Sequence, residues 1–290
     1  GTATLMVGSK SQGQGHETMY RQIAASRLGL DPGQTRVVEG DTDAVAFGAG
    51  SYGSRSAAIG GTALWLAADK VIAKGKRIAA HMLEAAEADV SFAAGRFSIA
   101  GTDRGVSLKE VARASFAFAK LPAGVEPGLF EHATFSPVQE TFPNGTHVCE
   151  VEVDPETGGV EIVNYVVVDD VGTEINPLTL HGQVAGGIVQ GLGQILMEQI
   201  VYDPETGQLL TGSFMDYAMP RAGDLCGFKI GHNAVPTRLN PLGAKGAGEA
   251  GTVGALAAAM NAIVDAIGTE DIEMPTTAER VWRALREKRP

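Results

Sequence analysis

The chain has 290 residues, of which 44% are hydrophobic and 20% are charged, a balance typical of a globular protein with a substantial core. The formal net charge of −11 argues against a nucleic-acid partner, because few basic side chains remain to neutralise phosphates. We find no apolar run long enough to span a bilayer and therefore expect no membrane insertion. Cys149 and Cys226 stand far apart in the sequence, which favours a cytoplasmic protein without disulfides.

The first chemical signal lies in a glycine-rich turn between a strand and a helix. Residues 2 to 7 are predicted to form the strand, residues 17 to 28 the helix, and the run from Gln12 to His16 lies between them. This order directs free backbone N–H groups and the positive end of a helix at an anion. The P-loop pattern GxxxxGK[ST] is absent. The amides of Gln12 and Gln14 both donate and accept, which suits the edge of a heterocycle; solvated turn residues are the alternative.

A second loop rich in glycine and serine precedes a second helix. We predict a strand at residues 36 to 39, a loop at residues 40 to 53, and a long helix from about residue 57 to residue 87. Apolar side chains on several sides of this helix indicate extensive burial. The run Tyr52-Gly53-Ser54-Arg55-Ser56 stands at its start, where Ser54 or Ser56 could serve as an N-cap. Two such loops in one chain favour ligand contact over simple turns.

The middle of the chain contains two predicted hairpins and a capped helix. Residues 90 to 100 form the first hairpin, and Ser107 with Glu110 forms a capping box for a short helix. Residues 122 to 143 lack a clear period, and we interpret them as a loop at a sub-domain junction. The second hairpin pairs residues 147–153 with residues 160–169.

The helix that follows the predicted cap Asn176 and Pro177 is unusually rich in glycine. Five glycines lie between residues 182 and 193. Each glycine costs about 1 kcal/mol in a helix interior relative to alanine. Their number indicates that the helix approaches a flat ligand or another backbone closely, and tight packing between helices is the alternative.

The last glycine-rich stretch runs from Asn240 to Gly254 and holds one cation, Lys245, and one carboxylate, Glu249. Glycine lets another group approach the backbone closely. A helix predicted at residues 255 to 267 follows directly, so the carboxylate stands close to a helix start in a position to touch a ligand. A site lined by glycine and alanine that holds little water raises the pKa of a carboxyl group toward working pH, as a general base needs. A loop that only closes a turn is the alternative.

Taken together, four motifs resemble the molybdenum hydroxylases, the family of xanthine dehydrogenase, aldehyde oxidase and carbon monoxide dehydrogenase. The motifs are Gln12 to Thr18, Tyr52 to Ser56, Gly182 to Gly187, and Pro241 to Glu249. The resemblance covers essentially the whole chain and corresponds to the C-terminal part of the molybdopterin-binding subunit. It implies an α+β fold of two mixed sub-domains, which we assign to residues 1–143 and 144–290.

The resemblance also implies roles for individual residues. Glu249 matches the glutamate that acts as the catalytic base and activates an oxygen for attack on an electron-poor carbon. The implied cofactor-binding residues are Gln12, Gly13, Gln14, Gly15, His16, Gly53, Ser54, Arg55, Gln183 and Lys245. Ala185 departs from the bulkier polar residue that many relatives have there. No side chain of this chain is implied as a metal ligand.

The implied cofactor is molybdenum–molybdopterin, in the cytosine dinucleotide form usual in the bacterial branch. About the first half of a complete molybdenum subunit has no counterpart in this sequence, and no cysteine set for an iron–sulfur cluster is present. We therefore expect the chain to need an N-terminal half or a partner molybdopterin subunit, together with iron–sulfur and FAD subunits and a small-molecule substrate. Alone, it should lack the cofactor and activity.

The function implied is oxidative hydroxylation of an aldehyde, an N-heterocycle or a similar small molecule, with water as the oxygen source. One alternative is a carbon monoxide dehydrogenase-type large subunit. Another is a non-catalytic fragment or split subunit that binds cofactor only with a partner chain, which the start at Gly1 instead of Met favours. An ordinary dinucleotide-binding enzyme is disfavoured, because the run from Gly13 lacks the third glycine of G-x-G-x-x-G.

Overall fold

The computed structural model describes residues 1–287, apart from the side chain of Lys120, and it divides into two compact units. The first unit combines residues 1–141 with residues 236–245, and the second combines residues 142–235 with the chain from residue 246 onward. Both units mix helices with small sheets, so the predicted α+β class is confirmed. The assignment of residues 1–143 and 144–290 to two parts of a molybdopterin-binding domain stays a prediction.

The first unit contains a two-stranded parallel sheet and a three-stranded antiparallel sheet. Its strands are β1 (Ala3–Val7), β2 (Thr35–Glu39), β3 (Val90–Ala93), β4 (Arg96–Ile99) and β5 (Gly105–Ser107). Its helices are α1 (His16–Leu28), α2 (Thr62–Leu83) and α3 (Leu108–Ala114), with a π-helix at Ser56–Gly61 and short 3-10 helices at Pro32–Gln34, Glu87–Asp89 and Phe118–Lys120. The helix α1 joins the parallel strands β1 and β2, because two parallel strands that follow each other in the chain need a crossover connection.

The helix α2 forms the centre of the core of the first unit. Phe97 is fully buried and packs on Gly75, where an added Cβ would lie 2.5 Å from Cζ of the ring. The prediction of one regular helix from residue 57 to residue 87 was wrong at both ends. Its first turns form the π-helix, and the α-helix stops at Leu83 because Glu84 adopts a left-handed backbone with φ 49°.

Local sequence signals for the next elements are confirmed. The hairpin of β3 and β4 turns at Ala94 and Gly95, both with positive φ. At the start of α3, the backbone N–H of Glu110 donates to Oγ of Ser107 at 3.2 Å, and the backbone N–H of Ser107 donates to the Glu110 carboxylate at 2.7 Å. The Ser107 hydrogen bonds hold the pKa of Glu110 below its ordinary value.

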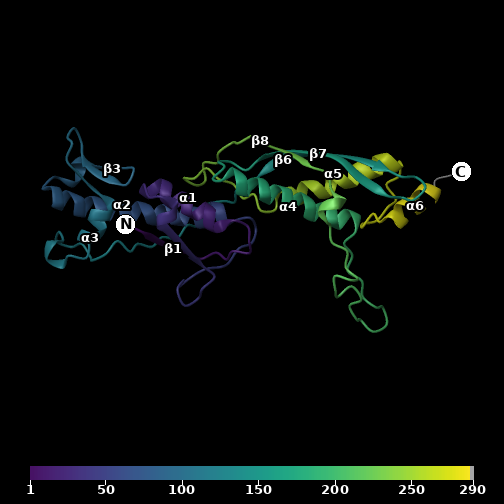
Figure 1. Cartoon of the computed structure of the whole chain (residues 1–290), viewed down its shortest axis with the longest axis horizontal. Helices are drawn as coiled ribbons and strands as arrows, with labels where there is room; N and C mark the ends of the chain where they lie inside the picture. The colour runs from purple at the N-terminus through teal and green to yellow at the C-terminus, as the bar shows by residue number, and fades with distance from the viewer. Residues whose placement is uncertain (288–290) are drawn as a thin grey trace. The chain divides into compact units, whose positions relative to one another are not determined.

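The second unit is a three-stranded sheet with helices packed on it. It contains β6 (Asn144–Val153), β7 (Val160–Asp170), β8 (Phe228–His232), α4 (Pro177–Leu196), α5 (Ala250–Ile267), α6 (Ala278–Glu287) and a 3-10 helix at Ala222–Asp224. The strands lie in the order β6-β7-β8, with β6 antiparallel and β8 parallel to β7. Figure 1 shows α4 and α5 side by side along this sheet, where Val184, Ile188, Ala255 and Ile263 are fully buried.

Glycine makes the close contact between α4 and α5 possible. An added Cβ on Gly187 would lie 2.9 Å from the backbone nitrogen of Thr252, and one on Gly251 would lie 3.0 Å from the backbone nitrogen of Ile188. Gly191 likewise faces Ala255. Helix packing therefore explains part of the glycine run in α4. Gly182 and Gly186 are exposed, however, and among residues 1–287 an added Cβ at either would meet no atom within 4 Å outside its own stretch of helix.

The helix α5 corrects two expectations. It begins at Ala250, five residues before the predicted start at residue 255. It is also long and apolar enough, by length and composition alone, to cross a membrane, which the sequence had not suggested. Part of its apolar character belongs to the core, because every fourth residue is buried in the second unit: Gly251, Ala255, Ala259, Ile263 and Ile267.

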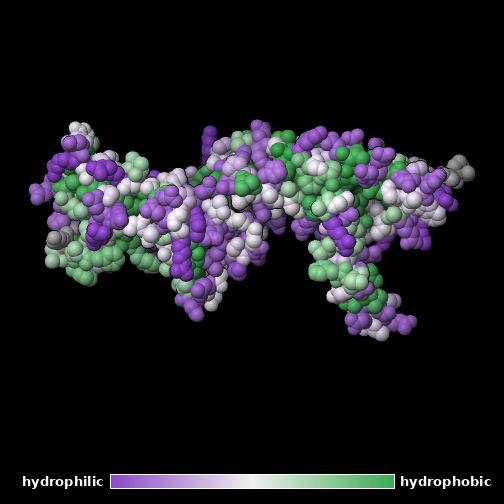
Figure 2. All heavy atoms as spheres, in the orientation of Figure 1, coloured by the Kyte–Doolittle hydropathy of each residue, from purple (hydrophilic) through white to green (hydrophobic). Residues whose placement is uncertain are grey.

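The connection between α4 and β8 projects from the helices of the second unit (Figure 1). Within it, the Leu210 N–H donates to the Val201 carbonyl at 2.8 Å, beside the turn at residues 203–208. Apolar surface covers much of the projection and its tip is hydrophilic (Figure 2), with Phe214 and Met215 81% and 92% exposed. We call residues 199–219 the projecting arm.

We predict opposite effects for two glycine-to-alanine changes. Gly251→Ala should destabilise the second unit by about 1–3 kcal/mol, because the new methyl group meets the backbone of α4. Gly182→Ala should stabilise it by about 0.5–1 kcal/mol, because the helix gains propensity and nothing lies near the new Cβ. Urea unfolding followed by Trp282 fluorescence in a Trp65→Phe background measures both, and effects of the same sign would contradict the packing argument.

Candidate functional site

The loop between β1 and α1 is shaped by two glycines in left-handed conformations. Gly13 has φ 98° and Gly15, the residue before α1, has φ 82°. An added Cβ on Gly13 would meet no atom within 4 Å, so this glycine is required by its backbone angle and leaves open space above the loop. No side chain caps the first turn of α1, so its N–H groups remain available for an anion.

The side-chain amides of Gln12 and Gln14, both predicted to face a ligand, differ in their contacts and exposure. The backbone N–H of Gln12 donates to Oε1 of Gln14 at 2.5 Å, and Nε2 of Gln14 lies 3.4 Å from the Lys10 carbonyl. Gln14 therefore stabilises the loop itself. The Gln12 side chain is exposed at the tip of the loop, beside Gly13.

The second glycine-rich loop interlocks with the first. Oγ of Ser51 donates to the Lys10 carbonyl at 2.7 Å and accepts from the Lys10 backbone N–H at 3.1 Å. The two backbones also touch: an added Cβ on Gly8 would lie 2.8 Å from Cα of Gly48. Side chains at Gly8 or Gly48 would push the two loops apart. With glycine at both positions, two loops that lie about forty residues apart in the chain are in direct contact.

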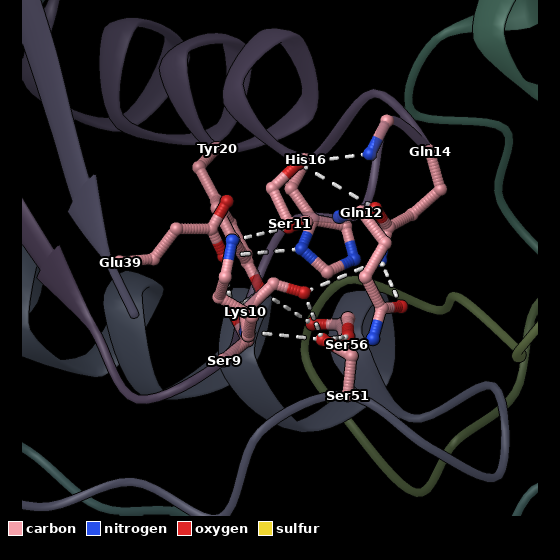
Figure 3. A network of polar contacts seen from close by, with 11 residues as sticks. Ser9, Lys10, Ser11, Gln12, Gln14, His16, Tyr20, Glu39, Ser51 and Ser56 are labelled. Atoms are coloured by element: carbon pink, nitrogen blue, oxygen red, sulfur yellow. Dashed lines mark hydrogen bonds and ion pairs between the residues drawn. The ribbon is translucent and has the colours of Figure 1, made fainter. Parts of the chain in front are cut away.

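Below the interlocked loops lies a buried polar network, shown in Figure 3. Nδ1 of His16 lies 3.1 Å from Oε2 of Glu39, and Oγ of Ser9 donates to the same oxygen at 2.7 Å. The side chains of His16 and Glu39 are 7% and 8% exposed. The Tyr20 hydroxyl donates to the Ser56 carbonyl at 3.2 Å, which ties α1 to the π-helix behind the second loop.

Tyr20 is fully buried at the base of this network. An added Cβ on Gly60 would lie 2.5 Å from its hydroxyl oxygen, so the π-helix approaches the ring closely. Burial raises the pKa of Tyr20 to about 12, with the nearby Glu39 carboxylate contributing in the same direction.

The motif around Arg55 ends the second loop with a constrained backbone. Gly53 and Ser54 adopt left-handed conformations, with φ 56° and 53°, directly before the π-helix. The Arg55 guanidinium lies 4.7 Å from the ring centroid of the exposed Tyr52. A flat cationic group stacked on an aromatic ring suits recognition of a planar or anionic group.

The remaining site residues lie on different elements. Gln183 is half-buried on α4 next to the open Gly182, and Glu249 is the exposed residue immediately before α5. Both belong to the second unit, whereas Lys245 belongs to the first. Because Glu249 is exposed, the described residues do not form the water-poor surrounding that its glycine and alanine neighbours predicted.

Sequence reasoning missed Ser9, Tyr20, Glu39 and Ser51. A signal for Glu39 was present, because it ends β2 and Ser9 follows the end of β1, its parallel neighbour. Carboxyl ends of adjacent parallel strands meet at one edge of a sheet, where ligands commonly bind in α/β structures. No signal in the sequence pairs Ser51 with Lys10, since that contact depends on the path of the second loop.

The residues of the first unit fit a polar heterocycle that carries phosphate. They offer backbone N–H groups at an uncapped helix start, an exposed amide at Gln12, the imidazole of His16 and open space above Gly13 and Gly53. Within residues 1–287, no group of three or more His, Cys, Asp or Glu side chains is arranged to hold a metal ion.

Comparison with known proteins defines the class. The molybdopterin cofactor-binding domain family matches residues 1–226, and the chain belongs to this family. The resemblance noted in the sequence is thereby confirmed.

Among similar proteins, the carbon monoxide dehydrogenase large chain of Hydrogenophaga pseudoflava is 38% identical over 99% of this chain and 36% of its own. The nicotine 6-hydroxylase large subunit of Paenarthrobacter nicotinovorans is 40% identical over 99% of this chain and 36% of its own. The crystal structure of the Cu,Mo-CO dehydrogenase superposes on 97% of this chain and 36% of that chain with a TM-score of 0.91 and 38% identity. The chain therefore spans about a third of the length of these relatives.

We predict an alkaline loss of stability that depends on Tyr20. Its pKa is about 12 in the folded chain, against an ordinary 10 in the unfolded chain. The neutral phenol thus stabilises the fold fully below pH 10, and this contribution of about 1–3 kcal/mol is lost as pH rises from 10 to 12. Urea unfolding of the first unit, followed by Trp65 fluorescence, should show a smaller fall over this range in Tyr20→Phe. The matched control is Tyr52→Phe, which removes an exposed phenol and should leave the fall unchanged; an equal fall in all three proteins would contradict the assignment.

Proposed function

We propose that this chain is the C-terminal, cofactor-binding part of a molybdenum hydroxylase catalytic subunit. The complete subunit would hydroxylate an aldehyde, an N-heterocycle or a similar small molecule, with water as the oxygen source. The observation that carries the proposal is the interlock of two glycine-rich loops over the buried His16, through Ser51 and the backbone of Lys10. The names of the relatives, a carbon monoxide dehydrogenase large chain and a nicotine 6-hydroxylase large subunit, support the reaction class.

Each set of residues has a role in this proposal. Backbone N–H groups of the loop from Gln12 to Gly15, with His16, bind the pterin and its phosphates, and Gly53, Ser54 and Arg55 bind the dinucleotide end. Gln183 contacts the pterin region and Lys245 lies beside the cofactor. When bound, the cofactor supplies two-electron redox chemistry at molybdenum. Glu249 would act as the general base, accepting a proton at its carboxylate during the reaction.

The cytosine dinucleotide form of the cofactor is a finer proposal. Its support within this chain is the stacked pair of Arg55 and Tyr52, which offers a cation and an aromatic face to the nucleotide end. Extraction of the bound nucleotide and its identification by mass spectrometry would test the base.

We propose that the exposed apolar surfaces of the second unit are covered in the complete enzyme. Phe214 and Met215 on the projecting arm and Leu178 at the start of α4 are each more than 80% exposed. Large exposed apolar side chains commonly mark interaction surfaces. The partners proposed are the N-terminal half or a second molybdopterin subunit, with iron–sulfur and FAD subunits to remove electrons.

A carbon monoxide dehydrogenase-type large subunit is the second candidate, favoured by the TM-score of 0.91. The two candidates differ by a copper-binding cysteine. Neither Cys149 nor Cys226 lies in such a cysteine loop. Burial, with Cys226 nearby, raises the pKa of the Cys149 thiol to about 11. A cysteine loop in the remainder of the subunit would favour this candidate over a hydroxylase.

The test of the proposal is molybdenum content by mass spectrometry, for the chain alone and after co-expression with the neighbouring reading frames. We expect near-stoichiometric molybdenum only in the co-expressed complex, since the chain holds part of the contacts. Metal in the chain alone would refute the need for a partner. Metal in neither preparation would favour a non-catalytic role.

For the catalytic base, we predict that Glu249→Gln in the complete enzyme lowers turnover by at least about a hundredfold, the usual scale for loss of a general base. The molybdenum and nucleotide contents should stay unchanged. A matched control is Glu17→Gln, which removes an exposed carboxylate on α1 that pairs with Arg21. Retained turnover in the Glu249 variant would remove this residue from the mechanism.

A further inference from the structure

The contact between His16 and Glu39 has a consequence for the ring nitrogen that faces away from it. Both side chains are more than nine-tenths buried, and Nδ1 of His16 lies 3.1 Å from Oε2 of Glu39 (Figure 3). An ionised carboxylate only accepts hydrogen bonds, so Nδ1 must carry a proton. Nε2, at the other end of the ring, has no hydrogen-bond partner among residues 1–287.

The neighbours of the pair fix this assignment. Ser9 has one hydroxyl proton and donates it to Glu39. The Tyr20 proton is therefore the one that faces both the Ser9 oxygen at 2.9 Å and the Ser56 carbonyl at 3.2 Å. Glu39 thus accepts from both Ser9 and His16. The ammonium group of Lys10 donates to the Ser11 carbonyl at 2.6 Å.

The position of the ring indicates what Nε2 binds. His16 is the first residue of the 13-residue helix α1, whose first turn has no side-chain cap, and the preceding loop is open above Gly13. An imidazole that carries protons on both nitrogens donates from Nε2 to an anion at this helix start. The Glu39 carboxylate balances the positive charge of this imidazolium inside the protein. Without such a partner, burial of the charged ring would be costly.

We propose that Glu39 is a positioning residue for the phosphate subsite of this loop: it holds the Nδ1 proton of His16 and so makes Nε2–H the donor to a phosphoryl group. The inference rests on the proposed function for the identity of the natural ligand, a pterin dinucleotide phosphate. The subsite chemistry itself is tested with inorganic pyrophosphate.

The direction in which one substitution changes anion affinity distinguishes a positioning role of Glu39 from a simple effect of its charge. Glu39→Gln removes a negative charge close to the subsite, which by charge alone strengthens anion binding. If Glu39 acts through His16, the same change weakens binding, because the ring loses the partner that stabilises its second proton. Glu17→Gln makes the same charge change in the first turn of α1 but affects only the exposed pair with Arg21, so it should bind pyrophosphate no more weakly than wild type.

The experiment measures pyrophosphate binding to the 290-residue chain by calorimetry and the protonation of the His16 ring by ¹⁵N NMR. We expect wild type with pyrophosphate to carry protons on both His16 nitrogens, and Glu39→Gln to bind about tenfold more weakly, with one nitrogen unprotonated. In a His16→Gln background, Glu39→Gln should cause no further loss. Far-ultraviolet circular dichroism checks that each variant is folded.

Three results would overturn the proposal: unchanged or tighter binding by a folded Glu39→Gln variant, an equal loss in the His16→Gln background, or an unprotonated Nδ1 in wild type with pyrophosphate. The last decides the matter even if Glu39→Gln does not fold. Failure of this proposal can be distinguished from failure of the proposed function. A complex without molybdenum whose chain still binds pyrophosphate through His16 and Glu39 would remove the proposed function and leave the subsite.

Discussion

The structure of the first unit depends on the close contact between two glycine-rich loops. Ser51 bonds to both backbone groups of Lys10, and Gly8 and Gly48 let the chains approach to a distance that a Cβ would prevent. This contact closes the loop before α1 over the buried network of Glu39. It also holds the second loop, with Arg55 at its end, against the first. The proposed ligand-binding groups, which come from distant parts of the sequence, therefore lie on two loops that are bonded to each other.

The second unit uses glycine for a different purpose. In α4 and α5, Gly187, Gly191 and Gly251 let two helices pack backbone against backbone, which positions Gln183 on one helix and Glu249 at the start of the other. Gly182 and Gly186 have no such neighbour within the described residues. The glycine run of α4 thus serves packing on one face and leaves another face open, which agrees with a chain that spans about a third of its relatives.

The buried ionisable groups of the first unit form one coupled system. Tyr20, Ser9, Glu39 and His16 are joined by hydrogen bonds of 2.7 to 3.1 Å, and Tyr20 also contacts the Ser56 carbonyl at 3.2 Å. The two hydroxyl groups and Nδ1 of His16 each face an acceptor, and satisfied contacts of this kind let a buried polar network stabilise a single arrangement. The raised pKa of Tyr20, caused first by burial, keeps its proton in place, facing the Ser9 oxygen and the Ser56 carbonyl.

The sequence alone determined the family, the α+β class and most elements, because local signals decide them: glycine loops before helices, the capping box at Ser107, and the hairpin turn at Gly95. It also predicted His16 and Arg55 as cofactor-binding residues by their motifs, and this stays a prediction. Only the tertiary structure decided the partners of these residues. Glu39 meets His16, and Ser51 meets Lys10, through contacts between segments 23 and 41 residues apart. Such contacts depend on backbone paths that no local pattern encodes, as do the π-helix and the exposure of Glu249.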